Sequence, residues 1–106
     1  MKSWLLLLSA SAVEVVMAYA LKESDSFSKA LPTLLGVVAA LLSIFLLASA
    51  MRDIPLGTAY VVWTGIGAVG VVLVGACLFG EHLSLARAVL LAMVIAGTAG
   101  LRFLEG

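Results

Sequence analysis

Residues 4–21 read WLLLLSASAVEVVMAYAL, an apolar run long enough to cross a bilayer as one helix. Glu14 is the only charged residue between Lys2 and Lys22, and a helix over this run places it near the middle of the bilayer. A charged side chain at that depth costs roughly 2.5 kcal/mol or more and usually marks an ion or substrate pathway. The run therefore predicts a membrane-spanning helix that carries a functional carboxylate.

The start of the same run also imitates a secretory signal peptide. Lys2 precedes the apolar residues, and residues 9–12 read SASA, which is similar to a cleavage site. However, the apolar stretch before that site is shorter than a normal signal sequence has, and the apolar pattern continues to Leu21. We therefore favour the membrane-helix interpretation.

Three more uncharged runs follow, at residues 30–51, 54–80 and 88–101. Because a crossing helix needs about 20 residues, the chain is predicted to be an all-α membrane protein with four transmembrane helices in one domain, residues 1–106. The expected spans are near 4–21, 32–51, 57–79 and 84–104. The short connections between them predict an antiparallel, up-down-up-down bundle.

The composition excludes several classes of protein. Hydrophobic residues make up 64% of the chain and charged residues 11%, whereas a soluble domain carries roughly 25% charged residues. The formal net charge is zero and no basic stripe is present, which argues against a nucleic-acid surface. His82 has no second ligand nearby, and Cys77 has no cysteine partner. No catalytic triad or phosphate loop is recognisable, so we expect no metal, no cofactor and no enzyme activity.

The basic residues are divided equally between the two sides of the predicted bundle. One side has Lys2, Arg52 and Arg102, and the other has Lys22, Lys29 and Arg87. The positive-inside rule therefore favours neither orientation. Either a weak bias in the first helix decides the orientation in the membrane, or the chains insert in both orientations and pair as an antiparallel dimer. The second interpretation would give Glu14 a partner subunit to face, since four helices alone leave no room for a pathway.

The helical neighbours of Glu14 are mostly small. Residues Ala10, Ser11, Met17 and Ala18 lie three or four positions away, on the same face. Small residues let another helix or a ligand come close, although Glu14 could also simply be hydrogen-bonded within the bundle. No basic residue lies in the middle of any span, and a carboxylate in that setting can exchange a proton for a cation, as proton-coupled export requires.

The third span carries an aromatic face. Tyr60, Trp63, Thr64 and Gly67 are spaced i, i+3, i+4 and i+7, and aromatic faces attract cations. An interfacial aromatic belt is the alternative, but Trp63 lies several residues inside the span. Gly65 and Gly67 together would weaken the helix and provide a conformational hinge, or would serve close packing alone.

Two further features of the sequence give weaker evidence for a functional role. Ser43 is a lone hydroxyl in the middle of the second span, where most serines bond their own backbone. The fourth span has a seam of small residues that would support close helix pairing. Its members are Ala92, Ala96, Gly97 and Gly100, and Gly97 and Gly100 are the candidate dimer contact.

Over essentially its full length the chain resembles the small multidrug resistance (SMR) transporter family. The resemblance rests on Glu14-Val15, on Lys22 at the end of the first helix, and on PLGTAYVVWTGIG at residues 55–67. The WTGIG form at 63–67 is most similar to the guanidinium-exporter branch.

The resemblance implies an antiparallel, dual-topology homodimer or heterodimer in the bacterial inner membrane that exchanges protons for cationic substrates. By position, Glu14 resembles the shared proton and substrate carboxylate. Tyr60 and Trp63 resemble the aromatic site residues, and Ser43 resembles the serine near the carboxylate. Guanidinium or substituted guanidinium is the favoured substrate.

Met17 departs from that pattern, because the guanidinium branch typically has Trp at this position. A thioether fills space but donates no hydrogen bond. With Thr64, Met17 is expected to line the pocket, where it could admit hydrophobic quaternary ammonium ions or mark one subunit of a heteromeric pair. Two other classes compete with the antiporter: a passive channel, whose leak would survive Glu14→Gln, and a structural subunit, which would not need Glu14.

Overall fold

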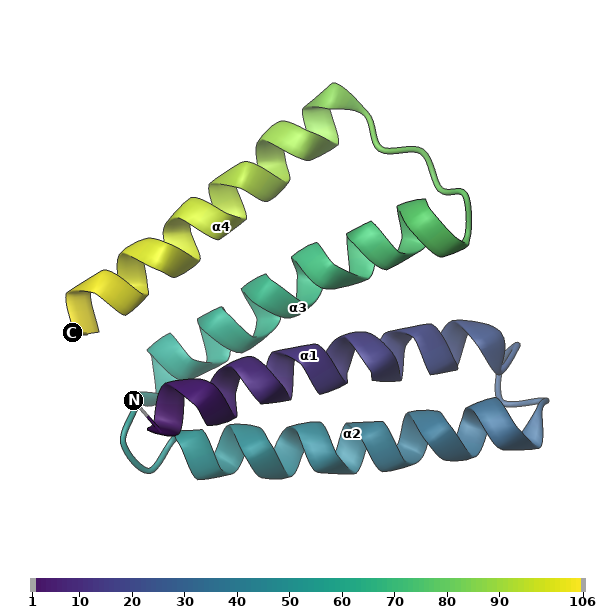
Figure 1. Ribbon diagram of the computed structural model, residues 1–106, viewed down its shortest axis with the longest axis horizontal. Coiled ribbons are helices and arrows are strands. Elements are labelled where there is room, and N and C mark those ends of the chain that lie inside the picture. Colours follow the sequence, from purple (N-terminus) through teal and green to yellow (C-terminus); the bar gives the residue numbers. More distant parts are fainter. Residues whose placement is uncertain (1, 106) are drawn as a thin grey trace.

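Four helices form the chain in the computed structural model, which describes residues 2–105. They are α1 (Lys2–Glu23), α2 (Ala30–Ala50), α3 (Leu56–Leu78) and α4 (Leu85–Glu105). All four are long and apolar enough to cross a membrane, which confirms the predicted all-α architecture with four spans. Consecutive helices run in opposite directions (Figure 1). The two chain ends and the α2–α3 turn therefore share one end of the molecule, the terminal end, and residues 24–29 and 79–84 share the other, the loop end.

Hydrogen bonds at the loop end define where helices stop and start. The Ser24 hydroxyl donates to the Leu21 carbonyl at 2.7 Å and accepts from the Phe27 amide at 3.1 Å. The next residues, 25–27, have positive φ angles of 48°, 62° and 66°, so the chain reverses sharply there. Ser84 accepts from the Arg87 amide at 3.2 Å, which is the N-cap bond that its place before α4 predicts.

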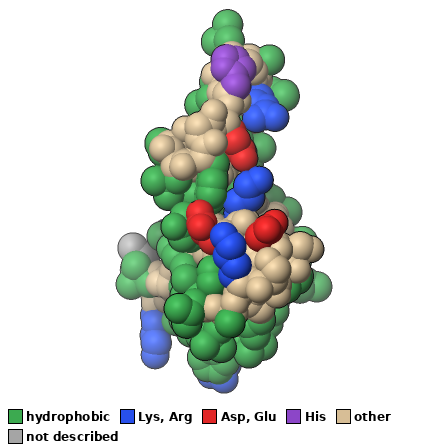
Figure 2. Space-filling model, turned by 90° about the vertical axis from the view of Figure 1, so that its right-hand side faces the viewer, with side chains coloured by type: hydrophobic (Ala, Val, Ile, Leu, Met, Phe, Trp, Pro, Cys, Tyr) green, Lys and Arg blue, Asp and Glu red, His purple; other side chains and the backbone are tan. Residues whose placement is uncertain are grey.

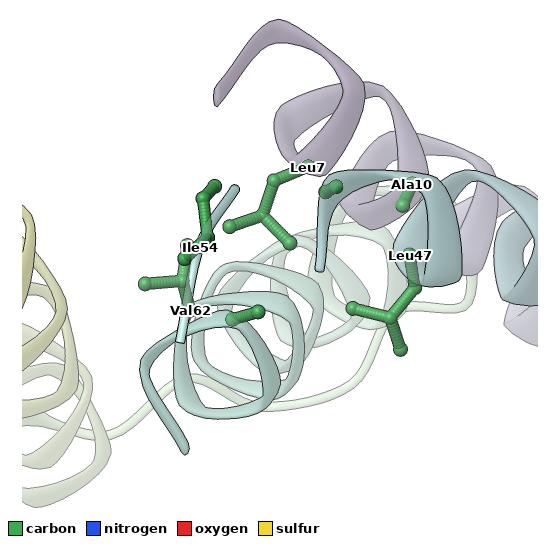
Figure 3. Close-up of a cluster of buried hydrophobic side chains, with 7 residues drawn as sticks. Leu7, Ala10, Leu47, Ile54 and Val62 are labelled. Atoms are coloured by element: carbon green, nitrogen blue, oxygen red, sulfur yellow. The ribbon is translucent and has the colours of Figure 1, made fainter. Parts of the chain in front are cut away.

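The apolar core lies toward the terminal end of the molecule, and Figure 3 shows its side chains. Leu7 and Ala10 of α1 meet Leu47 of α2 and Val62 of α3, and Ile54 of the α2–α3 turn closes the cluster. Leu7 and Ala10 are completely buried. The first three helices are thus joined through one cluster, and α1 lies between α2 and α3 in it.

A polar contact fastens the same end. The Ser3 hydroxyl donates to the Asp53 carboxylate at 2.5 Å, between the start of α1 and the α2–α3 turn. A hydrogen bond to a charged group is worth roughly 1.5–3 kcal/mol. It fixes the register of α1 against the turn, and so sets the height of the α1 side chains relative to α3.

The last helix stands apart from this unit. Within residues 2–105, α4 packs its backbone against α3 alone, and it diverges from α1 and α2 (Figure 1). Gly65 permits the contact, because a Cβ there would lie 2.6 Å from the Thr98 hydroxyl. The Arg102 guanidinium lies over the Trp4 ring, 4.6 Å from its centre. Most of the α4 surface is left uncovered.

Charged side chains gather at the ends of the helices. The loop end shows acidic and basic side chains next to one another, with apolar surface around them (Figure 2). This distribution matches a membrane protein whose helix ends meet water. Along α1 the only charge between the two ends is that of Glu14.

Candidate functional site

Glu14 points from α1 onto the backbone of α3 at Gly67. A Cβ at position 67 would lie 2.6 Å from the carboxyl carbon of Glu14 and 3.2 Å from its Oε2, and Oε1 would be closer still. Real Cβ atoms do not approach other atoms so closely, so the absence of a side chain at 67 is what admits the carboxylate. Gly67 thus has a contact role that its place in the sequence left open, and its role as a hinge stays a prediction.

The inner oxygen of this carboxylate is not satisfied by the protein. Oε1 is buried, and within residues 2–105 it has no hydrogen-bond partner. A buried polar atom without a partner is rare and costly, and the cost is greater for a charge in a membrane span. The role of Glu14 in binding a proton or a cation stays a prediction.

A chain of hydrogen bonds joins three helices beside Glu14. The Trp63 indole Nε1 donates to the Ser43 hydroxyl at 3.0 Å, and that hydroxyl donates to the Ala10 carbonyl at 2.7 Å. Ala10 lies one turn before Glu14 on α1. Ser43 is buried, and it bonds across to α1 rather than to its own helix as most membrane serines do. The bonds tie the Trp63 ring to α2 and, through Ser43, to α1. Trp63 lies about one helical turn before Gly67 on α3.

Tyr60 lies beside Trp63, on the outer side of the site. Its ring centre is 5.6 Å from that of Trp63, with the two planes tilted by 54°. Tyr60 is 53% exposed, so it stands at the edge of the site and not inside it. The two rings together offer π faces, which attract cations, on the same helix as Gly67.

The side chain of Thr64 does not point toward α2 as that of Trp63 does. Its hydroxyl donates to the Tyr60 carbonyl at 2.9 Å and to the Val61 carbonyl at 3.2 Å, and its side chain borders the groove between α3 and α4 near Gly97. Successive helical residues point about 100° apart, so Trp63 faces α2 while Thr64 turns toward α4. The pocket-lining role of Thr64 stays a prediction.

The remaining predicted residues fall in different places. Met17, three residues after Glu14, is half-buried. Gly65 contacts Thr98 of α4, so its visible role is packing. Gly97 and Gly100 are exposed, and within the described part of the chain no neighbouring atom lies within 4 Å of where their Cβ atoms would be. That surface is open to another helix, as a dimer contact would need.

Two groups in the contacts around Glu14 were not predicted from the sequence. The Ala10 carbonyl is a backbone group and gives no sequence signal. Gly70 receives the Val15 side chain, whose Cγ2 lies 2.5 Å from where a Cβ would be. The three-residue spacing of Gly67 and Gly70 places them on one face of α3, and this spacing was a signal that α3 approaches another helix closely.

Known proteins are similar to this chain over nearly its whole length. The sequence model of the family described as "Small Multidrug Resistance protein" matches residues 2–94. A protein of Yersinia pseudotuberculosis named "Guanidinium exporter" is 48% identical over 100 residues, which cover 94% of this chain and 96% of that protein. Proteins of the same name from Citrobacter freundii and Salmonella typhimurium are 46% identical, again over 94% of this chain and 95% of each of theirs.

Proposed function

The chain belongs to the small multidrug resistance family, and on that premise we propose that it is a proton-coupled antiporter exporting small cations, with guanidinium or substituted guanidinium favoured. The observation that carries the proposal is the buried, unpartnered Oε1 of Glu14. This oxygen is the acceptor that a proton and a cation would share.

Sharing one carboxylate would couple the two fluxes. An ionised carboxylate in a membrane span is unstable without a positive partner. It therefore binds either a proton or the cation, and binding one displaces the other. A transporter that moves only while the carboxylate is occupied then exchanges protons for cations across the membrane.

The choice of guanidinium rests on chemistry and on the relatives. Guanidinium is planar and can form two parallel N–H···O bonds with a carboxylate, and it also stacks on aromatic rings. Glu14 supplies the carboxylate, and Trp63 and Tyr60 supply the rings. The relatives named "Guanidinium exporter" retain close to half of this sequence.

We also propose an antiparallel dimer in the bacterial inner membrane. The six basic residues are divided equally between the terminal end and the loop end, which permits insertion in both orientations. The open small-residue surface of α4 at Gly97 and Gly100 offers the contact. In Gly97→Leu we expect the dimer mass in detergent to fall to that of the monomer; a variant that stays dimeric would place the contact elsewhere.

Transport in liposomes tests the function. Purified protein is reconstituted with a proton gradient, and uptake of guanidinium is followed together with the internal pH. We expect coupled movement of both ions in the wild type, loss of both in Glu14→Gln, and no loss in the matched control Glu23→Gln, which removes a carboxylate at the end of α1. A guanidinium leak that persists in Glu14→Gln would instead indicate a channel, and absence of flux in the wild type would refute the proposal.

Hydrophobic quaternary ammonium ions are the second candidate substrate. Met17 supports it, because a thioether beside Glu14 leaves space without adding a hydrogen-bond donor. A tetraalkylammonium ion replaces guanidinium in the same liposomes. Faster proton-coupled flux of the tetraalkylammonium ion would make the protein a multidrug exporter, or one subunit of a heteromeric pair if only a mixture with a relative transports.

A further inference from the structure

A second group of aromatic and charged side chains lies at the loop end of the α1–α3 groove. It lines a cleft of about 220 Å³, a volume equal to that of several water molecules at about 30 Å³ each. Its walls are Val15, Ala18, Tyr19 and Lys22 of α1, and Val71, Val74 and Gly75 of α3, with Phe79 and Glu81 just beyond α3. Glu14 does not line this cleft. The Glu14 carboxylate lies against Gly67 and the Glu81 carboxylate against Gly75, which are separated by about 12 Å along α3.

The aromatic wall is formed by Tyr19 and Phe79. Their ring centres are 5.8 Å apart and their planes are tilted by 39°. The Lys22 ammonium lies over the Phe79 ring, 6.0 Å from its centre. This is the outer limit of a cation–π contact, so the ring already faces a cation that is part of the chain.

The acidic side of the cleft is fixed by the end of α3. The amides of Phe79 and Glu81 both donate to the Gly75 carbonyl, at 3.1 and 3.0 Å. Gly80 between them has a φ of 66°, a left-handed conformation that glycine adopts without strain. The Glu81 carboxylate then lies against Gly75, and a Cβ there would be 3.0 Å from its carboxyl carbon.

These contacts bring one carboxylate, two aromatic rings and one ammonium to the same cleft. One carboxylate and two aromatic residues line the cleft, and among residues 2–105 the only cation that lines it is the flexible Lys22 side chain. Because the Lys22 side chain is a flexible chain of four carbons, its ammonium can move away from the Phe79 ring into water. The vacated space then has the chemistry that an organic cation needs.

We propose that Tyr19, Phe79 and Glu81 form a peripheral subsite for guanidinium-type cations at the loop end, and that the Lys22 ammonium competes for it. The subsite rests on the proposed function only for the choice of cation. The subsite lies in the same α1–α3 groove as Glu14, nearer the loop end.

The test removes the central site and examines the peripheral one. Glu14→Gln protein in lipid nanodiscs is titrated with millimolar guanidinium chloride, and the NMR signals of the Tyr19 and Phe79 rings are followed. We expect saturable shifts that potassium chloride at equal ionic strength does not reproduce. Shifts that do not saturate, or that potassium chloride reproduces, would overturn the proposal.

Three variants in the Glu14→Gln background sharpen the result. Lys22→Met should tighten guanidinium binding about 2- to 5-fold, the scale of an exposed cation–π contact. Glu81→Gln should weaken it about tenfold, the scale of one charge-assisted hydrogen bond, whereas Glu23→Gln, a carboxylate outside the cleft, should not change it. Weaker binding in Lys22→Met, or equal losses in Glu81→Gln and Glu23→Gln, would contradict the subsite.

The two proposals fail separately. If the rings report saturable binding while wild-type liposomes show no proton-coupled flux, the subsite stands and the antiporter function falls. If flux is normal and the rings do not respond, the antiporter stands and the subsite falls.

Discussion

Gly67→Ala is the most direct test of how the central carboxylate is positioned. The new methyl group would occupy the space of the Glu14 carboxyl group, whose carbon lies 2.6 Å from the Cβ position. Of the two groups, the side-chain end of Glu14 moves more easily than the backbone of α3. We therefore expect the helices to stay packed and the carboxylate to be displaced.

Two opposing effects on the free energy of unfolding are expected in Gly67→Ala. Alanine in a helix interior is favoured over glycine by about 1 kcal/mol, while forcing an extra methyl into a packed contact costs roughly 1–3 kcal/mol. The net loss in the free energy of unfolding is then at most about 2 kcal/mol. Binding should suffer more, because losing one hydrogen bond to a charged group costs roughly 1.5–3 kcal/mol. This corresponds to a Kd for guanidinium that is about 10- to 150-fold weaker.

Calorimetric titration with guanidinium, paired with thermal unfolding, separates the two effects. Gly57→Ala is a control in the same helix, since within residues 2–105 nothing approaches its Cβ position within 4 Å. Gly70→Ala is a second comparison, because there the methyl meets Val15 instead of Glu14, so stability should fall with less effect on Kd. Wild-type guanidinium affinity in Gly67→Ala would refute the idea that the Gly67 contact positions the carboxylate.

Three further outcomes are expected. A double-mutant cycle of Trp63→Phe and Ser43→Ala should show a coupling of about 1 kcal/mol in unfolding free energy, the net worth of their hydrogen bond; additive losses would mean that the bond contributes nothing. Gly65→Val should destabilise the protein by about 1–3 kcal/mol, because its branched side chain meets Thr98, and adding Thr98→Ala should restore part of the loss; no recovery would assign the cost to another contact. Met17→Trp should raise the flux of guanidinium relative to a tetraalkylammonium ion in liposomes, since it adds an indole donor beside the carboxylate, and an unchanged ratio would show that Met17 does not set selectivity.

The fold was predictable because a membrane simplifies the problem. Uncharged runs of about 20 residues have one stable solution in a bilayer, the helix, and the short connections fix its direction. Glu14 stands out in the sequence for the same reason, since a lone charge in such a run is costly, and its functional role stays a prediction.

The partners of these residues could not be predicted in the same way. Hydropathy indicates where a helix runs but not which other helix it contacts. From the sequence, Gly67 could therefore be a bend or a packing position, and its contact with Glu14 could not be predicted. Ser43 is similar: a mid-span hydroxyl normally bonds its own helix, and only the approach of α1 diverts it to the Ala10 carbonyl. Thr64 lies one turn after Tyr60, yet its hydroxyl bonds carbonyls of its own helix and its side chain borders the groove between α3 and α4.

The separation of α4 from α1 and α2 has a consequence for the order of biosynthesis. The Glu14–Gly67 contact and the bonds from Trp63 through Ser43 to Ala10 involve α1, α2 and α3 alone. A chain leaves the ribosome from its N-terminus, so every residue of the central site is available to pack before α4 has been synthesised. The last helix, with its exposed Gly97 and Gly100, is not needed for any of these contacts within the chain, so its uncovered surface is free for assembly.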